Sequence, residues 1–118
     1  MFGIGTYFAE NASKSDFYTT CEDCHTCRDC KHAEQERCIL VARVLLGETQ
    51  VTKSRCDSLR RAPDGYDSIT AEKRERDGIV DHMEFITYKE QNALVRWLIY
   101  YRHKSDCPCH NCRYRRRP

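Results

Sequence analysis

Apolar residues gather in three stretches of the chain that have the length of strands. Residues 38–47 form the most apolar stretch, partly β-branched and closed by a glycine, which is typical of a buried strand. The polar stretch 48–53 follows directly, and we expect it to continue into a paired strand. Residues 79–88 and 94–103 have the same strand character, and the polar residues 89–92 between them predict a turn.

The start of the chain predicts the one helix. Residues 1–9 fit a glycine-hinged turn leading into a short strand, because glycine allows backbone angles and close approaches that a side chain blocks. Residues 10–18 contain no Pro or Gly and offer Asn or Ser as a cap, so we expect a short helix there. Residues 57–78 are charged and turn-rich, with a turn at 62–65 and a brief extended segment at 67–69. Together these patterns predict an α+β fold, a mostly antiparallel β-sheet with one short helix.

Length and charge narrow these expectations. A chain of 118 residues is one domain at most. No apolar run approaches the roughly 20 residues of a membrane span, and the N-terminus lacks the basic and apolar regions of a secretory signal. We therefore expect no membrane partner. The net charge is only +2, but residues 102–118 hold six Lys or Arg and one Asp, so the basic character belongs to this end.

The cysteines point to a metal site. Nine cysteines are many for this length, and their odd number argues against a closed set of disulfides. Without a secretory signal, clustered Cys-x2-Cys spacing favours a structural zinc ion in the polar loop 19–38; the alternative is a loop of thiols without zinc. The candidate zinc ligands are Cys21, Cys24, Cys27, Cys30, His32 and Cys38. The same reasoning predicts a reducing, intracellular location, nuclear or cytoplasmic, and leaves the oligomeric state open.

One carboxylate interrupts a mostly apolar strand. Glu84 lies in the stretch Met-Glu-Phe-Ile-Thr-Tyr over residues 83–88. Burying an unpaired carboxylate costs several kcal/mol. The chain therefore either exposes Glu84 on an edge strand that faces water, or uses it.

The expected helix also carries candidate chemistry. Ser15 and Tyr18 are three residues apart, so on a helix they share a face. A hydroxyl and an aromatic ring on one face suit a flat ligand with an amide group, because the ring stacks and the hydroxyl bonds the carboxamide. Tyr7, on the preceding strand, would close the other side. The alternative is an amphipathic helix whose Tyr18 caps the core.

The first 18 residues, MFGIGTYFAENASKSDFY, resemble the nicotinamide-binding strand and helix of the poly(ADP-ribose) polymerase family, and most of all its tankyrase-like members. The family pattern is Gly-x-Gly-x-Tyr-Phe-Ala followed by Ser-Lys-Ser-x-x-Tyr, and the chain matches it without a gap. Three weaker similarities follow in the family's order: RCILVARVLLGE, APDGYDS and HMEFITYKEQNALVRWLIYY. The resemblance covers about residues 1–101.

The resemblance implies a partial ADP-ribosyltransferase fold that transfers ADP-ribose from NAD⁺ to protein acceptors and releases nicotinamide. It implies that Tyr7 and Glu84 are the Tyr and Glu of the family's catalytic His-Tyr-Glu triad. Ser15 would then bond the nicotinamide amide, Tyr18 would stack on its ring, and Lys14 would lie near the acceptor. The full set of implied NAD⁺-binding residues is Gly5, Tyr7, Phe8, Ala9, Lys14, Ser15 and Tyr18.

The family's triad His lies in a His-Gly pair upstream of the Gly-x-Gly motif, and residues 1–118 contain no such pair before it. We therefore expect residues 1–104 to be the C-terminal part of a catalytic domain and residues 105–118 to be a Cys- and Arg-rich tail. The tankyrases have a small zinc site in the loop that corresponds to 19–38, with a Cys and His spacing that this chain does not reproduce.

The tail offers further candidates. Residues 107–112 hold three cysteines and a histidine, a second and weaker metal candidate. The basic residues 113–117 are compatible with nuclear import or nucleic-acid contact, or with a solubilising tail. Two other functions stay open: a small zinc-binding module that binds nucleic acid or protein, and an inactive relic that still binds nicotinamide. The zinc module accounts for the cysteines and arginines but not for Glu84 or the glycine motif.

Overall fold

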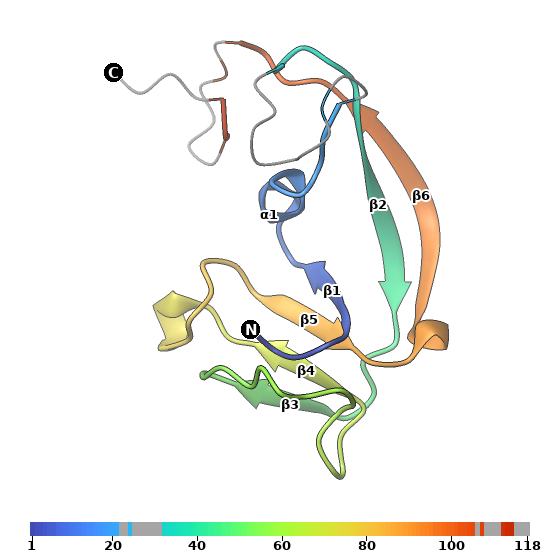
Figure 1. Cartoon of the computed structure of the whole chain (residues 1–118), viewed down its shortest axis with the longest axis vertical. Helices are drawn as coiled ribbons and strands as arrows, with labels where there is room; N and C mark the ends of the chain where they lie inside the picture. Colours follow the sequence, from blue (N-terminus) through green and yellow to red (C-terminus); the bar gives the residue numbers. More distant parts are fainter. Residues whose placement is uncertain (22–23, 25–31, 106, 108–111, 115–118) are drawn as a thin grey trace. The chain divides into compact units, whose positions relative to one another are not determined.

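The computed structural model describes residues 1–21, 24, 32–105, 107 and 112–114 (Figure 1). The described elements, in chain order, are β1 (Thr6–Ala9), α1 (Ala12–Asp16), β2 (Arg37–Val44), β3 (Thr49–Thr52), β4 (Ser68–Ala71), the 3-10 turn η1 (Arg74–Arg76), β5 (Glu84–Thr87), the 3-10 turn η2 (Glu90–Asn92) and β6 (Ala93–Tyr101). The predicted fold class is confirmed: α+β, a mostly antiparallel sheet with one short helix. Within the described ranges, no helix is both long and apolar enough to cross a bilayer.

The chain forms two compact units. The first comprises residues 1–11 and 42–95, and the second comprises residues 12–41 and 96–118. Strands β1, β3, β4 and β5 belong to the first unit and α1 to the second, while β2 and β6 pair with each other and contribute residues to both. The two units bury very different kinds of side chain.

A four-stranded sheet in the order β1-β5-β4-β3 organises the first unit. β5 runs antiparallel to both β1 and β4, and β3 joins β4 in parallel. Side chains alternate between the two faces along a strand, so Ile86 and its partner Ile69 lie on the same face of the sheet. This face, called the core face below, carries the apolar core, whose buried members are Phe2, Ile69, Ala71, Val80 and Ile86.

The loop before β1 requires both of its glycines. Gly3 has φ of +82°, and a Cβ there would lie 2.0 Å from the Leu59 carbonyl oxygen. A Cβ on Gly5 would lie 2.7 Å from Cγ2 of Ile86 and 2.8 Å from the carbonyl oxygen of Thr87. The Gly-x-Gly spacing therefore lets this loop close on its neighbours in the first unit at two points.

The second unit has no comparable apolar core among its described residues. Its buried side chains are Asp16, Cys21 and Arg37, which are 6%, 3% and 2% exposed. Two of the three, Asp16 and Arg37, carry charged groups, and buried polar groups have to be hydrogen-bonded or paired to be tolerated. A small unit that lacks an apolar core needs other cross-links for stability, and metal sites are one common kind.

The stretch 38–47 is a strand, as predicted, but it is not buried. β2 covers most of it, yet Leu40 and Val41 are 60% and 40% exposed. Among the described strands β2 pairs with β6 alone, and β6 is equally exposed, with Trp97 at 67%. A two-stranded sheet cannot cover its own faces, and none of the described residues buries these side chains. The stretch 48–53 also forms a strand, but it pairs with β4.

Two other strands differ in length from their predictions. The predicted strand 79–88 shortens to β5, and Val80 makes only an isolated parallel bridge with Lys73. The brief extended segment predicted at 67–69 is instead a full interior strand, β4, with all four residues buried. The sequence of β4, Ser-Ile-Thr-Ala, is short and polar and therefore does not predict a buried strand. The burial of β4 comes from the strands on either side of it rather than from its own hydrophobicity.

Candidate functional site

Tyr7 and Glu84 lie on adjacent strands and on the same face of the sheet. In the β1–β5 register Tyr7 is opposite Ile86 and Ala9 is opposite Glu84. Because directly opposed residues share a face, as do residues two apart on one strand, all four lie on the core face. Tyr7 and Glu84 are diagonal neighbours, and such pairs are roughly 7–8 Å apart, within reach of aromatic and long side chains.

Glu84 is buried, with 6% exposure. The interpretation of Glu84 as a water-facing residue on an edge strand is therefore wrong, because β5 lies between β1 and β4. Its opposite residues on these two strands are Ala9 and Ala71, so its nearest cross-strand neighbours are small. Buried glutamates are uncommon in proteins, and a functional role would explain why the chain retains one here.

Tyr7 is fixed through its hydroxyl group while part of its ring stays open. The hydroxyl accepts a hydrogen bond from the Phe2 N–H at 3.0 Å and donates one to the Gly3 carbonyl at 2.8 Å. The residue is 41% exposed, and its ring is tilted against that of Phe2 with centroids 6.5 Å apart. A ring that is held in place and partly open can stack on a flat ligand without losing much further freedom.

Tyr88, just after β5, holds the same loop from the other side. Its hydroxyl donates to the Phe2 carbonyl at 2.6 Å. Burial, with Cys56 and Tyr7 adding electrostatically, raises the pKa of Tyr88 to about 12. Tyr88 is therefore a neutral donor throughout the physiological range.

The other predicted binding residue of β1, Phe8, lies opposite Phe85 on the reverse face of the sheet from Tyr7.

The remaining predicted NAD⁺-binding residues, Lys14, Ser15 and Tyr18, belong to the second unit. α1 ends at Asp16, but the turn continues, because the Tyr18 N–H donates to the Ser15 carbonyl at 3.0 Å. Ser15 and Tyr18 are thus one turn apart, as the spacing predicted. Tyr18 is 72% exposed, so the alternative in which it caps a core is wrong. The contact of these three residues with NAD⁺ stays a prediction.

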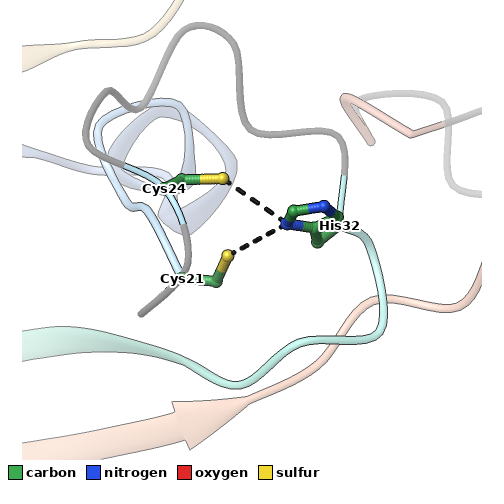
Figure 2. Close-up of side chains that lie close together, drawn as sticks. All are labelled: Cys21, Cys24 and His32. Carbon is green, nitrogen blue, oxygen red and sulfur yellow. Dashed lines mark hydrogen bonds between the residues drawn. The ribbon is translucent and has the colours of Figure 1, made fainter.

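Three of the predicted zinc ligands converge in the second unit (Figure 2). The Sγ atoms of Cys21 and Cys24 lie 3.4 and 3.5 Å from the same atom, Nδ1 of His32. A ring nitrogen carries either one proton or one lone pair, so hydrogen bonding by itself accounts for only one of these approaches. With Zn–S of about 2.3 Å and Zn–N of about 2.0–2.1 Å in a tetrahedron, the S···N edge is roughly 3.6 Å. The donor set and its spacing therefore fit zinc, and we call this group the Cys21/Cys24/His32 centre.

The other predicted ligands do not join this centre in the described part of the chain. Cys27 and Cys30 lie outside the described residues. Cys38 is described, and its thiol donates to the Ile39 carbonyl at 3.7 Å. A fourth ligand from among these three stays a prediction.

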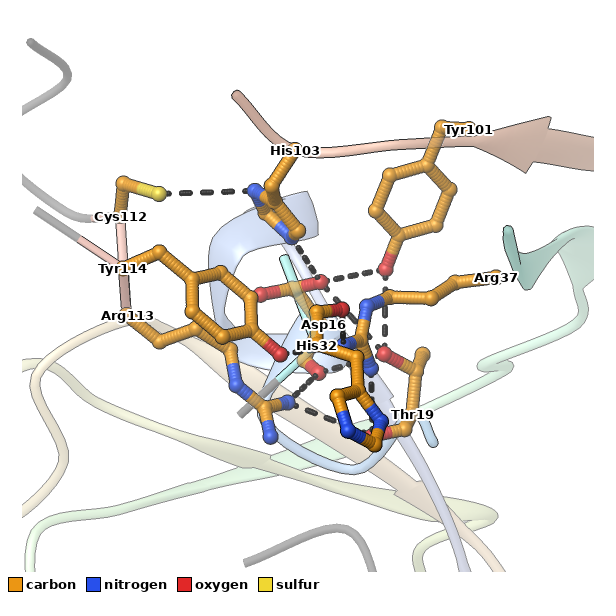
Figure 3. A network of polar contacts seen from close by, with 9 residues as sticks. All are labelled: Asp16, Thr19, His32, Arg37, Tyr101, His103, Cys112, Arg113 and Tyr114. Atoms are coloured by element: carbon orange, nitrogen blue, oxygen red, sulfur yellow. Dashed lines mark hydrogen bonds and ion pairs between the residues drawn. The ribbon is translucent and has the colours of Figure 1, made fainter. Parts of the chain in front are cut away.

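A buried polar network that the sequence did not indicate fills the second unit (Figure 3). Asp16 is its centre: Oδ1 accepts from the hydroxyl of Tyr101 and lies 2.7 Å from Nε2 of His103. Burial and then the hydrogen bond to Asp16 raise the pKa of Tyr101 to about 12. Arg37 donates to the His32 carbonyl at 2.8 Å and to the Tyr114 hydroxyl, which connects the network to the Cys21/Cys24/His32 centre.

Part of the predicted basic cluster also belongs to this network. Arg113 donates to the backbone carbonyl of Asp16 at 2.7 Å and lies 5.9 Å from the centroid of the Phe17 ring. The solubilising-tail interpretation therefore fails for Arg113 and for its neighbour Tyr114. Residues 115–117 of the cluster, and Cys109 and His110, lie outside the described residues. No sequence signal marks the network, because its members come from four separate segments.

A mostly antiparallel sheet that sets a Gly-x-Gly-x-Tyr strand beside a Glu strand suggests the ADP-ribosyltransferase class. The comparison with family models agrees and is more specific. The model of the poly(ADP-ribose) polymerase catalytic domain matches residues 1–82. This is more than half of the chain, which therefore belongs to the poly(ADP-ribose) polymerase catalytic domain family. The matched range contains Tyr7, Ser15 and Tyr18 and ends before Glu84.

Proposed function

We propose that this chain carries the Tyr and the Glu of an ADP-ribosyltransferase site of the tankyrase-like kind, which uses NAD⁺ to modify protein acceptors inside the cell. The observation that carries the proposal is the buried Glu84 carboxylate on the same sheet face as the partly open Tyr7 ring. Because the chain belongs to the poly(ADP-ribose) polymerase catalytic domain family, we assign this pair to ADP-ribose transfer.

The chemistry gives a reason for a carboxylate at residue 84. Transfer breaks the glycosidic bond between ribose and nicotinamide, and positive charge develops on the ribose ring in the transition state. A fixed carboxylate beside the ribose stabilises this charge, and the effect is larger in a site from which water is excluded. The same carboxylate can accept a hydrogen bond from a ribose hydroxyl and polarise the acceptor. An amide in its place would keep the shape and lose the charge.

The binding half of the proposal assigns the nicotinamide ring to aromatic side chains. In the first unit the Tyr7 ring offers a stacking surface, and in the second unit the Tyr18 ring offers another, with the Ser15 hydroxyl as a partner for the carboxamide. Support comes from the open Tyr7 ring, the exposed Tyr18 and the turn that keeps Tyr18 next to Ser15. Zinc at the Cys21/Cys24/His32 centre would have a structural role, as a cross-link in a unit with little apolar core.

A comparison of two carboxylates tests the proposal. Full-length chain is incubated with labelled NAD⁺ and acceptor protein, and transferred label is counted for wild type, Glu84→Gln and Glu72→Gln. Glu72 is a matched control, because it is also nearly buried but bonds the neighbouring Lys73 N–H at 3.1 Å. We expect Glu84→Gln to lose at least about 100-fold in transfer, the range for removal of one transition-state stabilising group, and Glu72→Gln to keep it. Equal transfer by Glu84→Gln and wild type would refute the role of Glu84.

Thermal stabilisation by a nicotinamide-mimicking inhibitor separates the proposal from its alternatives. A zinc module without a nicotinamide site predicts no stabilisation in the wild type. Stabilisation without any transfer of label identifies the inactive, nicotinamide-binding relic. The proposed site predicts both transfer and stabilisation, with stabilisation retained in Glu84→Gln, because the amide keeps the shape of the pocket.

A further inference from the structure

Two metal-ligating side chains that follow β6, His103 and Cys112, lie next to each other in the second unit (Figure 3). Nδ1 of His103 lies 3.4 Å from Sγ of Cys112. Burial and the neighbouring Cys107 thiol raise the pKa of Cys112, and a backbone hydrogen bond from Tyr114 partly offsets this. Cys112 is thus the common neighbour of an imidazole and a second thiol, and all three residues are intermediate in exposure.

The histidine is already oriented as a ligand. Its other nitrogen, Nε2, lies 2.7 Å from Oδ1 of Asp16, and the Asp16 side chain is buried. When the carboxylate accepts a hydrogen bond from the Nε2–H group, Nδ1 carries the lone pair, and this lone pair is directed at the Cys112 sulfur. The arrangement of carboxylate, imidazole and metal is the usual outer support of a histidine ligand, and it fixes both tautomer and ring orientation.

We propose that His103, Cys107 and Cys112 bind a second metal ion, with Zn²⁺ as the expected occupant and Asp16 as the residue that orients His103. The S···N separation of 3.4 Å is close to the roughly 3.6 Å edge expected of a tetrahedral zinc site. Two thiolates and one imidazole suit zinc better than the hard cations, which prefer oxygen. The site shares no ligand with the Cys21/Cys24/His32 centre, and closing it requires the Cys107 sulfur to approach the imidazole.

Two other uses of these residues fit the structure less well. A nucleophilic cysteine activated by the His103–Asp16 pair would use Cys112 alone and leave Cys107 without a role. A disulfide between Cys107 and Cys112 would leave the oriented imidazole without a purpose. A metal ion uses all three donors and the carboxylate behind them.

The second unit also has a physical need for such a cross-link. Its described buried side chains are Asp16, Cys21 and Arg37, so apolar burial contributes little to holding residues 102–105 and 112–114 in place. Metal binding supplies folding free energy directly in small units of this kind. The ring of Tyr114 packs on His103 with centroids 4.9 Å apart, which extends the support of the proposed ligand.

The test counts metal ions per chain. The full chain is purified under a phosphine reductant with Zn²⁺, and bound zinc is measured for wild type, Cys112→Ser, Cys107→Ser and the control Cys56→Ser, whose thiol lies in the first unit. We expect each of the first two variants to bind one ion fewer than wild type, and Cys56→Ser to lose none. Cys112→His, which keeps a ligand, is expected to retain the full count. Unchanged zinc in both Cys112→Ser and Cys107→Ser would overturn the proposal.

This count also separates the two centres. Cys24→Ser removes an ion from the Cys21/Cys24/His32 centre only, so the proposed structural role of that centre and the present inference can fail independently. In the Cys24→Ser chain loaded with Co²⁺, a thiolate-to-cobalt charge-transfer band that weakens when Cys112→Ser is added supports the second site, and a band that Cys112→Ser leaves unchanged overturns it.

A second pair of variants tests the role of Asp16 without deleting a ligand. Asp16→Asn is expected to weaken the second ion by 10- to 100-fold in a chelator competition, the usual effect of losing an outer-shell partner. Tyr101→Phe is the control, because it removes another hydrogen bond to the Asp16 carboxylate and keeps the His103 side chain. If both variants keep wild-type zinc affinity, or both lose it equally, Asp16 does not orient a metal ligand.

Discussion

Replacing Gly3 by Ala is expected to destabilise the first unit far more than the same change at Gly65. The two glycines have nearly the same backbone angle, with φ of +82° and +83°. Alanine in this left-handed region costs about 1–2 kcal/mol at either position. The surroundings differ completely, because a Cβ at Gly65 meets nothing within 4 Å, whereas a Cβ at Gly3 lies 2.0 Å from the Leu59 carbonyl oxygen.

The additional cost at Gly3 can be worked from its contacts. Real Cβ atoms essentially never approach closer than 3.0 Å, so the Leu59 carbonyl has to recede by about 1 Å. This movement breaks the 2.8 Å hydrogen bond from the Ile4 N–H, worth about 1 kcal/mol. Leu59 also packs on the core, and overpacking of this kind costs roughly 1–3 kcal/mol. The total for Gly3→Ala is then about 3–6 kcal/mol, against about 1–2 kcal/mol for Gly65→Ala.

The assay is equilibrium urea unfolding, combined with amide hydrogen exchange of β4 and β5, which reports on the first unit alone. Gly3→Ala should lower the protection of these strands strongly, and Gly65→Ala should do so only slightly. Because the Gly3 carbonyl accepts the Tyr7 hydroxyl, the same variant should also weaken binding of a nicotinamide mimic. If the two variants lose the same free energy of unfolding, within about 0.5 kcal/mol, the close approach to Leu59 is not the reason why Gly3 has to be a glycine.

Three further predictions concern other parts of the molecule. The pKa of Tyr88 is about 12 in the folded chain, above its ordinary value of 10, so the stability that Tyr88 contributes is complete below pH 10 and is lost as the pH rises to 12. The urea midpoint of Tyr88→Phe should therefore fall less between pH 10 and 12 than the midpoint of wild type or of the exposed control Tyr66→Phe. Parallel curves for the three chains would contradict this. Gly78→Ala places a Cβ 1.7 Å from the Glu72 carbonyl oxygen, and its melting temperature should fall by an amount that corresponds to about 3 kcal/mol or more; an unchanged melting temperature would refute the close approach. A zinc chelator should remove amide protection from residues 32–41 and 96–105 and leave β4 and β5 protected, because the metal donors lie in the second unit. Equal protection with and without the chelator would exclude a structural metal.

Local signals identified much of the first unit. The Gly-x-Gly-x-Tyr motif placed a turn and strand at the N-terminus, and the structure shows the steric reason, since both glycines face close neighbours. The stretch 94–103 was recognised as a strand from its apolar residues, which β6 confirms. β4 was underestimated, because a polar four-residue strand is buried by its partners and not by its own composition.

The sequence by itself determined the fold class, the family and the residue types available for chemistry: a tyrosine after two glycines, a carboxylate in an apolar strand, and cysteines at metal-binding spacing. These are local features, and each leaves a mark in a short window of residues. Only the tertiary structure decided that Glu84 is buried on an interior strand beside the strand of Tyr7, and that Asp16 stands behind His103. Strand order and long-range hydrogen bonds join residues more than 70 positions apart, and no pattern within a short window records such a contact.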